Sequence, residues 1–362
     1  MRKTLYLHIG HFKTGTTAIQ QFLHLNPRLL KRHGLVFAQT KQEHSKHSDL
    51  AFSLYQAAGV KDLMHGYAKP ETPHEVWTSV FEELRRSRRS GMIVSTEELI
   101  RLACFPKAVE ILKKIVETAP DLDIKIIAYL RAPDSHLRSW YNQLVKRGCK
   151  TPSFNAAISH RTEPEHYDYA LALKPWISLF GAESIFLRHY SEDSRKDRAL
   201  FHDFLSIFNI EMPRLGVTHV IEDPNPRMAE DTLEVARILQ NADASNRIVE
   251  TSQNRSNAYF QMEETQNLAR SADAFEEIRS RTLGGLDQLA QQLPEFSKPL
   301  KKFRAHLPVQ EAGASSDGCL LAGLLLSERH VLRKTMNSQN WMLTERLEAL
   351  EAEFSARGSK PS

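Results

Sequence analysis

Short apolar runs alternate with segments of helical spacing in the first part of the chain. Strands are expected where apolar and β-branched residues cluster, at residues 4–9, 35–38, 92–95, 124–130 and 184–187. Apolar positions three and four apart indicate helices over residues 16–25, from residue 133 to Arg147, and around residues 200–208. Strands that alternate with helices favour an α/β fold, in which a central parallel sheet carries helices on both faces.

The pattern changes beyond about residue 221, where strand signals disappear. Helices are expected over residues 231–239 and 257–293, with a polar loop at 309–318 and a frayed tail at 358–362. Near the C-terminus, an apolar stripe is formed by Leu343, Leu347, Leu350 and Phe354. We expect this stripe either to pack on its own domain or to pair with another protomer. We therefore expect an α/β domain over residues 1–220 and a mostly helical C-terminal extension over 221–362, which can pack on the same domain.

The composition is that of an ordinary globular protein, with 41% hydrophobic and 25% charged residues. The formal charge of +4 is too small to favour duplex nucleic acid as a partner, so anion binding must come from locally placed charge. Cys104, Cys149 and Cys319 lie far apart, which argues against a disulfide framework or a zinc cluster. The sequence shows neither a signal-peptide pattern nor a long apolar run, so we expect a cytoplasmic protein without a membrane span.

A candidate phosphate site follows the first expected strand, in the loop from Gly10 to Thr17 (GHFKTGTT). A glycine near each end lets the backbone turn tightly and approach a ligand. The loop amides and the N-terminus of the next helix suit phosphate oxygens, while Lys13 adds a positive charge and Thr16 and Thr17 add hydroxyl donors. The alternative is a glycine-containing turn that binds nothing.

The spacing of the two glycines matches an ATPase phosphate loop, but the next residue does not. Such a loop places Lys directly after the second glycine, followed by Ser or Thr for magnesium. Here Thr16 follows Gly15, and the lysine stands earlier, at Lys13. The loop therefore predicts a site for a 5′-phosphate rather than for a γ-phosphate with Mg²⁺. This argues against a small-molecule kinase, which is the alternative enzyme.

The run HIGHFKTGTT resembles the 5′-phosphosulfate-binding loop of sulfotransferases that use 3′-phosphoadenosine 5′-phosphosulfate (PAPS), in their bacterial and carbohydrate-acting branch. The resemblance covers roughly residues 1–215. It implies a P-loop-type sheet, PAPS as the sulfate donor and no metal. It also implies that the 5′-phosphosulfate is held by Lys13, Thr14, Gly15, Thr16 and Thr17.

The second signature of that family is a strand that ends in Arg, with Ser eight residues later on the next helix. Arg131 ends the expected strand at 124–130, and Ser139 stands eight residues on. A side chain at the carboxyl end of a parallel strand points into the crevice where such sheets bind ligands, and a guanidinium suits phosphate. By resemblance, Arg131 and Ser139 hold the 3′-phosphate. The alternatives are a salt-bridging arginine and an ordinary helical serine.

Sulfuryl transfer needs a base for the acceptor and a cation that neutralises the leaving phosphate. Lys13 fits the second task. Glu97 stands where small-phenol sulfotransferases have their catalytic histidine, so we expect it to be the base and Glu98 to face away. Alternatively, the two glutamates only begin a helix, where acids are favoured. His47 is the rival base, because the ordinary pKa of histidine suits the task.

These features together predict a sulfotransferase that transfers the sulfuryl group from PAPS to a hydroxyl or amine. The family branch favours a carbohydrate or glycoconjugate as acceptor. The expected partners are PAPS, its product adenosine 3′,5′-bisphosphate and the acceptor, with a homo-oligomer formed through the C-terminal helices as a further possibility. A third alternative is a protein that binds adenosine bisphosphate without catalysis. It would keep both phosphate anchors and lose the base.

Overall fold

The structure, a computed structural model, describes residues 2–61, 63, 66–148, 150–213, 219, 220, 230–241, 245, 246, 249, 272–309 and 317–358. Three predictions fall partly outside these residues. They are the first part of the expected helix 257–293, residues 310–316 of the expected loop, and residues 359–362 of the tail.

Two compact units make up the chain. The first comprises Met1–Trp140, Ile158–Pro226 and Ser271–Gln310, and the second comprises Tyr141–Ala157, Arg227–Arg270 and Glu311–Ser362. The boundary after residue 220 that composition suggests stays a prediction. No helix of the described residues combines the length and the apolar character needed to cross a membrane.

The first unit is built on a five-stranded sheet in the order β2-β3-β1-β4-β5, and every strand pair is parallel. The strands are β1 (Lys3–Gly10), β2 (Leu35–Phe37), β3 (Gly91–Ser95), β4 (Leu122–Arg131) and β5 (Ile185–Tyr190). All five were expected, although β5 begins one residue later and extends through two polar residues. Because the strands are parallel, their carboxyl ends share one edge of the sheet.

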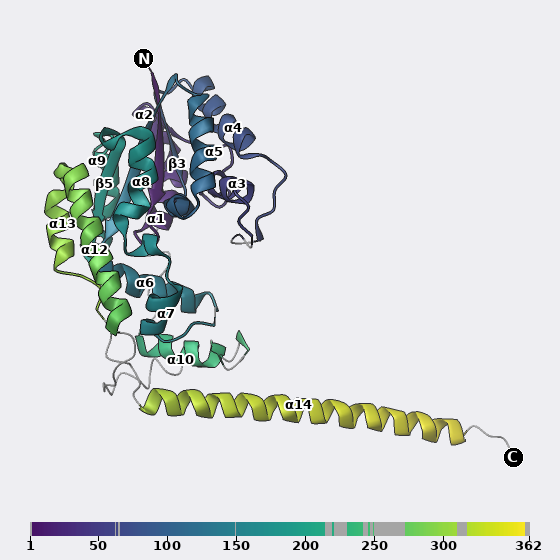
Figure 1. The fold of residues 1–362 in the computed structure, drawn as a ribbon. Coiled ribbons are helices and arrows are strands. Elements are labelled where there is room, and N and C mark those ends of the chain that lie inside the picture. The colour runs from purple at the N-terminus through teal and green to yellow at the C-terminus, as the bar shows by residue number, and fades with distance from the viewer. Residues whose placement is uncertain are drawn as a thin grey trace. The chain divides into compact units, whose positions relative to one another are not determined.

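Alternating side chains divide the core into two layers. On β1, Leu5, Leu7 and Ile9 face one layer, whereas Tyr6 faces the other. The Tyr6 side is covered by three helices, α1 (Thr16–Leu25), α2 (Pro27–Arg32) and α9 (Ala199–Ser206). The opposite side is covered by α3 (Asp49–Ala57), α4 (Pro73–Arg86), α5 (Pro106–Glu117), α8 (Tyr169–Phe180), α12 (Ala272–Gln292) and α13 (Ser297–Arg304). The expected parallel sheet with helices on both faces is therefore confirmed (Figure 1).

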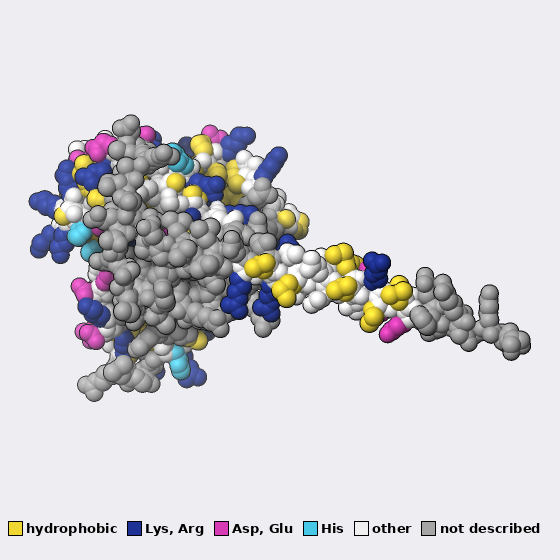
Figure 2. All heavy atoms as spheres, turned by 90° about the horizontal axis from the view of Figure 1, so that it is seen from below, with side chains coloured by type: hydrophobic (Ala, Val, Ile, Leu, Met, Phe, Trp, Pro, Cys, Tyr) yellow, Lys and Arg dark blue, Asp and Glu magenta, His cyan; other side chains and the backbone are white. Residues whose placement is uncertain are grey.

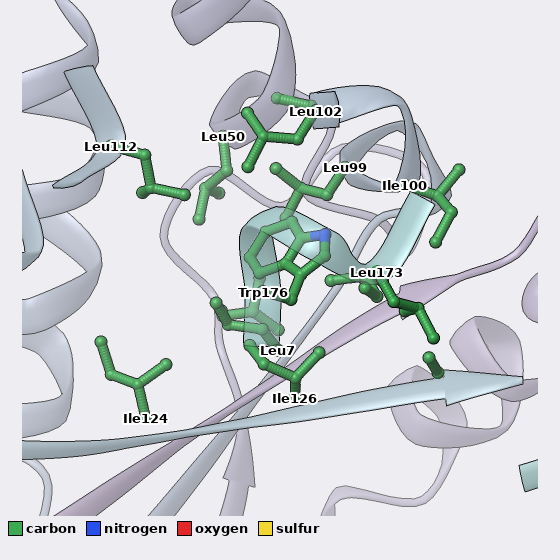
Figure 3. Packing of buried hydrophobic residues seen from close by; sticks show 14 of the residues in the cluster. Leu7, Leu50, Leu99, Ile100, Leu102, Leu112, Ile124, Ile126, Leu173 and Trp176 are labelled. Carbon is green, nitrogen blue, oxygen red and sulfur yellow. The ribbon is translucent and has the colours of Figure 1, made fainter. Parts of the chain in front are cut away.

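Trp176 of α8 lies at the centre of the larger layer (Figure 3). Its fully buried ring packs with Leu7 and Ile126 of the sheet and with Leu99 and Leu102 of the 3-10 segment η2 (Glu97–Cys104). Replacing such a buried aromatic ring by Ala costs about 3–5 kcal/mol in protein cores. This packing therefore fixes η2 against the carboxyl half of the sheet.

The remaining elements include α6, which follows β4, and several short 3-10 turns. Their bounds are α6 (Pro133–Lys146), α7 (Phe154–Arg161), η3 (Pro164–His166), η4 (Ala182–Ser184), η5 (Glu192–Arg195) and η7 (Pro294–Phe296). The expected helix from residue 133 to Arg147 is confirmed as α6, and Gly148 follows it with φ of 75°. Glycine relieves the strain of this left-handed stop.

The second unit contains α10 (Glu230–Asn241) and α14 (Asp317–Gly358), which contact each other. Helix α10 confirms the helix expected over 231–239. Its buried residues Leu233, Ala236 and Leu239 form a small core with Tyr141 and Val145. The expected loop at 309–318 is wrong in its last two residues, because α14 has already begun there.

Helix α14 also changes the interpretation of the apolar stripe. Leu343, Leu347 and Leu350 are exposed, so the second unit does not bury them itself. The side chain of Phe354 lies outside the described part of the chain.

Candidate functional site

The loop from Gly10 to Thr17 connects the central strand β1 to α1, as the sequence predicts. Gly10, Lys13 and Gly15 all adopt positive φ, of 81°, 61° and 79°. The His11 N–H donates to the Tyr129 carbonyl of β4 at 3.0 Å, which ties the loop to the neighbouring strand. The loop therefore folds back over the carboxyl edge of the sheet.

Neighbouring side chains leave no space at either glycine. A Cβ on Gly10 would lie 3.0 Å from the Cβ of Glu97, and one on Gly15 would lie 2.6 Å from Cδ2 of Leu200. Both positions therefore need glycine for space as well as for backbone conformation. The first contact also places the start of the loop directly against Glu97.

Lysine and threonine side chains of the loop differ in exposure. Lys13 is half-buried and Thr17 is exposed, whereas Thr14 and Thr16 are buried. The Thr14 hydroxyl donates to the His11 carbonyl at 2.6 Å, so this side chain braces the loop itself. Backbone amides, Lys13 and the start of α1 are then the groups that suit an anion.

Glu97 lies at the end of β3, where η2 begins. Its side chain is 15% exposed, and its Oε2 accepts a hydrogen bond of 2.8 Å from Gln20 Nε2 of α1. The Nζ of Lys46 lies 3.9 Å from Oε1. Burial, and then the nearby Glu98 carboxylate, raise the pKa of Glu97 above its usual value. A carboxylate with a raised pKa is a stronger base at neutral pH than an ordinary one.

Glu98 has a different environment, although it is adjacent. It is 1% exposed, and its carboxylate accepts hydrogen bonds of 2.7 Å from Lys46 and 2.5 Å from the Thr96 hydroxyl. Burial alone would raise the pKa of Glu98, but Lys46 and Thr96 hold it below its usual value. Opposite shifts in two neighbouring carboxyl groups often separate a reacting residue from its support. Both glutamates also begin η2, as the alternative interpretation held.

His47 is fully buried between the ends of β2 and β3. Its Nε2 donates to the Ala38 carbonyl at 3.0 Å, and its Nδ1 accepts from the Ser95 N–H at 3.2 Å. Burial lowers the pKa of His47. Because both ring nitrogens bond to the backbone, His47 suits a structural role, and Glu97 stays the predicted base.

Arg131 ends β4, opposite Tyr190 of β5. Its guanidinium forms an ion pair with Glu192 and lies 5.7 Å from the centre of the Tyr190 ring. Ser139 lies buried on α6, one helical turn after His136. Burial and the neighbouring histidines lower the pKa of His136 well below its usual value, and the charges of Arg131 and Lys13 lower it further. The proposed phosphate anchors Arg131 and Ser139, and also Lys13 of the loop, are therefore near the His136 ring.

A histidine cluster, formed by His11, His136 and His166, lies beneath these anchors and was not predicted. All three rings are fully buried, and candidate ligand atoms lie within 4.8 Å of one another. His136 Nε2 and His166 Nδ1 are 3.0 Å apart while the ring centres are 5.3 Å apart. The two rings therefore meet head-on, as in an N–H···N hydrogen bond. The remaining ring nitrogens, His11 Nδ1, His136 Nδ1 and His166 Nε2, are buried and form no hydrogen bond among the described residues.

Glu165 connects the histidine cluster to η2. Its carbonyl oxygen accepts a hydrogen bond of 2.9 Å from His11 Nε2, and its carboxyl accepts one of 2.9 Å from Cys104 Sγ. Burial, and then Glu163, raise the pKa of Glu165 to about 7. Burial also raises the pKa of Cys104, which keeps this thiol protonated and unreactive near neutral pH.

No family model matches the chain. A protein of Archaeoglobus fulgidus, named only as an uncharacterized protein, is 28% identical over a match of 158 positions that covers 42% of this chain. The match spans only 40% of that protein's length. A sulfotransferase from Alicyclobacillus acidocaldarius has a similar solved structure, with 17% identity, a TM-score of 0.39, and coverage of 72% of this chain and 96% of that one.

Proposed function

We propose that the protein is a sulfotransferase that takes the sulfuryl group from PAPS. One observation carries the proposal: the loop Gly10–Thr17, Glu97 and Arg131 lie at the carboxyl ends of three adjacent strands, β1, β3 and β4, at the same edge of a parallel sheet. Ligands of open α/β sheets bind at this edge. A phosphate loop, a base with a raised pKa and a second phosphate anchor are the three parts that sulfuryl transfer from PAPS requires.

In the proposed complex, the loop amides, Lys13 and the Thr16 and Thr17 hydroxyls hold the 5′-phosphosulfate. Arg131 and Ser139 hold the 3′-phosphate. The Arg131 guanidinium already pairs with the exposed carboxylate of Glu192, so it is oriented for an anion at this position. The phosphate would replace that carboxylate, and its bidentate geometry suits the guanidinium better.

The reaction is a single in-line displacement. The acceptor oxygen, or an amine nitrogen, forms a bond to sulfur while the bond between sulfur and the bridging phosphate oxygen breaks. Glu97 takes the acceptor's proton, and Lys13 neutralises the charge that develops on the leaving phosphate. The products are a sulfate ester or sulfamate and adenosine 3′,5′-bisphosphate. A carbohydrate or glycoconjugate acceptor is the preferred class, through the resemblance of the loop alone.

The anchors are tested by binding of adenosine 3′,5′-bisphosphate, measured as the rise in the melting temperature that this ligand causes. Lys13→Ala and Arg131→Ala should each reduce the rise strongly, because each removes a charge that the ligand's phosphates need. Lys113→Ala, an exposed lysine on α5, is the matched control and should keep the full rise. Arg131→Lys keeps the charge but loses the planar fork, and should give an intermediate result. Equal shifts for all four variants would contradict the proposed anchors.

The base is tested separately with Glu97→Gln. This variant should bind adenosine 3′,5′-bisphosphate normally but turn over about 10²–10⁴ times more slowly, which is the usual contribution of a general base. Release of the bisphosphate from PAPS in the presence of an acceptor measures the rate. Unchanged turnover would remove Glu97 from the mechanism. Normal binding without turnover in the parent, across an acceptor panel, would favour the non-catalytic alternative.

A further inference from the structure

Large apolar side chains lie exposed along the described part of α14 (Figure 2). The exposed fractions are 61% for Met336, 64% for Leu343, 59% for Leu347 and 51% for Leu350. Single exposed apolar residues are ordinary on protein surfaces, but a contiguous row of them marks an interaction surface. The second unit buries none of these four side chains itself.

The spacing of these four residues follows the seven-residue repeat of a coiled coil, whereas the exposed Leu332, Trp341 and Met342 lie at other positions of the repeat. Met336, Leu343 and Leu350 recur every seven residues, which is the d position, and Asn340 and Leu347 occupy the a position between them. We call these five residues the seam. A repeat of seven keeps the seam on one side of a helix that winds around a partner of the same kind.

We propose that the seam of α14 binds the seam of a second copy of this chain, as a parallel two-stranded coiled coil. The pattern suits a copy of the same helix, because each d leucine then packs beside its own counterpart. Asn340 supports two strands in one register, since paired asparagines at a single a position can hydrogen bond with each other and penalise other alignments. Such a contact joins two protomers through their C-terminal helices.

The flanking charges fit the same arrangement. Arg346 occupies a g position and Glu351 an e position, and both side chains are exposed. In a parallel, in-register pair, a g residue lies opposite the e residue five positions later on the other helix. Arg346 of each copy therefore lies opposite Glu351 of the other, with two ion pairs per dimer. An antiparallel pair aligns g with g and e with e, which brings like charges together.

The first test measures the mass of the full chain in solution by light scattering. The parent should be a dimer, and Leu347→Asp should be a monomer, because it places a charge in the seam. Met342→Asp is the matched control: Met342 is 54% exposed but lies outside the seam at a c position. It should remain a dimer. A monomeric parent, or equal loss of the dimer in both variants, would overturn the proposal.

A charge swap tests partner orientation without disturbing the seam. Arg346→Glu alone should weaken dimerisation, because it faces two glutamates toward each other across the helices. Adding Glu351→Arg should restore the dimer, since the opposite charges meet again with their order reversed. Circular dichroism checks that each variant keeps its helical content. Failure of the double variant to recover would refute the parallel pairing.

Discussion

The strongest quantitative prediction concerns His8, which points from β1 into the layer under α9. Its ring is 1% exposed, lies between Tyr129 and Phe204, and shares a 2.8 Å hydrogen bond with the Ser95 hydroxyl. Burial lowers the pKa of His8 from 6.5 to about 3. The unfolded chain therefore binds a proton more readily than the folded one between these values. The contribution of His8 to the free energy of unfolding is complete above pH 6.5 and is lost as pH falls toward 3.

Between pH 7.5 and pH 5.0, the contribution of His8 to the free energy of unfolding falls by about 2 kcal/mol, as the two pKa values require. His8→Asn removes the titration and keeps a polar group near the Ser95 hydroxyl. The variant should therefore lose about 2 kcal/mol less than the parent when the pH is lowered from 7.5 to 5.0. Other groups also titrate in this window, and Glu165 acts in the opposite direction, so only the difference between variant and parent isolates His8.

Urea unfolding at the two pH values, followed by tryptophan fluorescence, measures this difference. The core residues Trp77 and Trp176 are both fully buried in the first unit and report its unfolding. His202→Asn, an exposed histidine on α9, is the control and should show the same pH response as the parent. If His8→Asn also responds like the parent, the folded-state pKa of His8 is not lowered and the reasoning is wrong.

Two further substitutions test the loop and the candidate base. Gln20→Leu removes a hydrogen bond that lowers the pKa of Glu97, so the pKa should rise and the acidic limb of the pH–rate profile should move to higher pH. If the limb does not move, Glu97 does not control it. Gly15→Ala should weaken bisphosphate binding and destabilise the protein by more than the ~1–2 kcal/mol of a left-handed alanine, because Leu200 occupies the space. Gly59 has a similar φ but open surroundings, so Gly59→Ala should lose only the backbone part of the free energy of unfolding, measured by urea unfolding. Equal losses of stability in the two variants would contradict the packing argument.

Local patterns explain why much of the sheet edge could be predicted. The β1–loop–α1 segment carries its own signals, a β-rich run, two glycines and a helix of regular spacing. The signals that predict the end of β4 at Arg131 also lie within a single short segment of the sequence. Helix α3 gave no such signal because every residue from Asp49 to Tyr55 is buried, which hides the period of an amphipathic helix. Helix α4 did carry a readable start, because Thr72 and Glu75 form a capping box.

The surroundings of Glu97 could not be predicted in the same way. Gln20 lies 77 positions before Glu97 in the sequence, and Lys46 lies 52 positions before Glu98. Only the tertiary fold brings these two side chains to the carboxylates. The histidine cluster likewise joins the loop, α6 and η3, and nothing local marks His136 or His166. Gln20 is a polar residue on the mostly apolar buried face of α1, and this was the available sign that a polar group lies opposite that face.

Calorimetric titration of the unaltered protein with adenosine 3′,5′-bisphosphate, compared with ATP and Mg²⁺, tests the central claim most directly. The bisphosphate carries the two phosphates that the loop and Arg131 would hold, whereas ATP lacks the 3′-phosphate and needs a lysine after Gly15 that this chain does not have. The account predicts tight binding of adenosine 3′,5′-bisphosphate and weak or no binding of ATP. Preference for ATP, or binding of neither nucleotide, would contradict it.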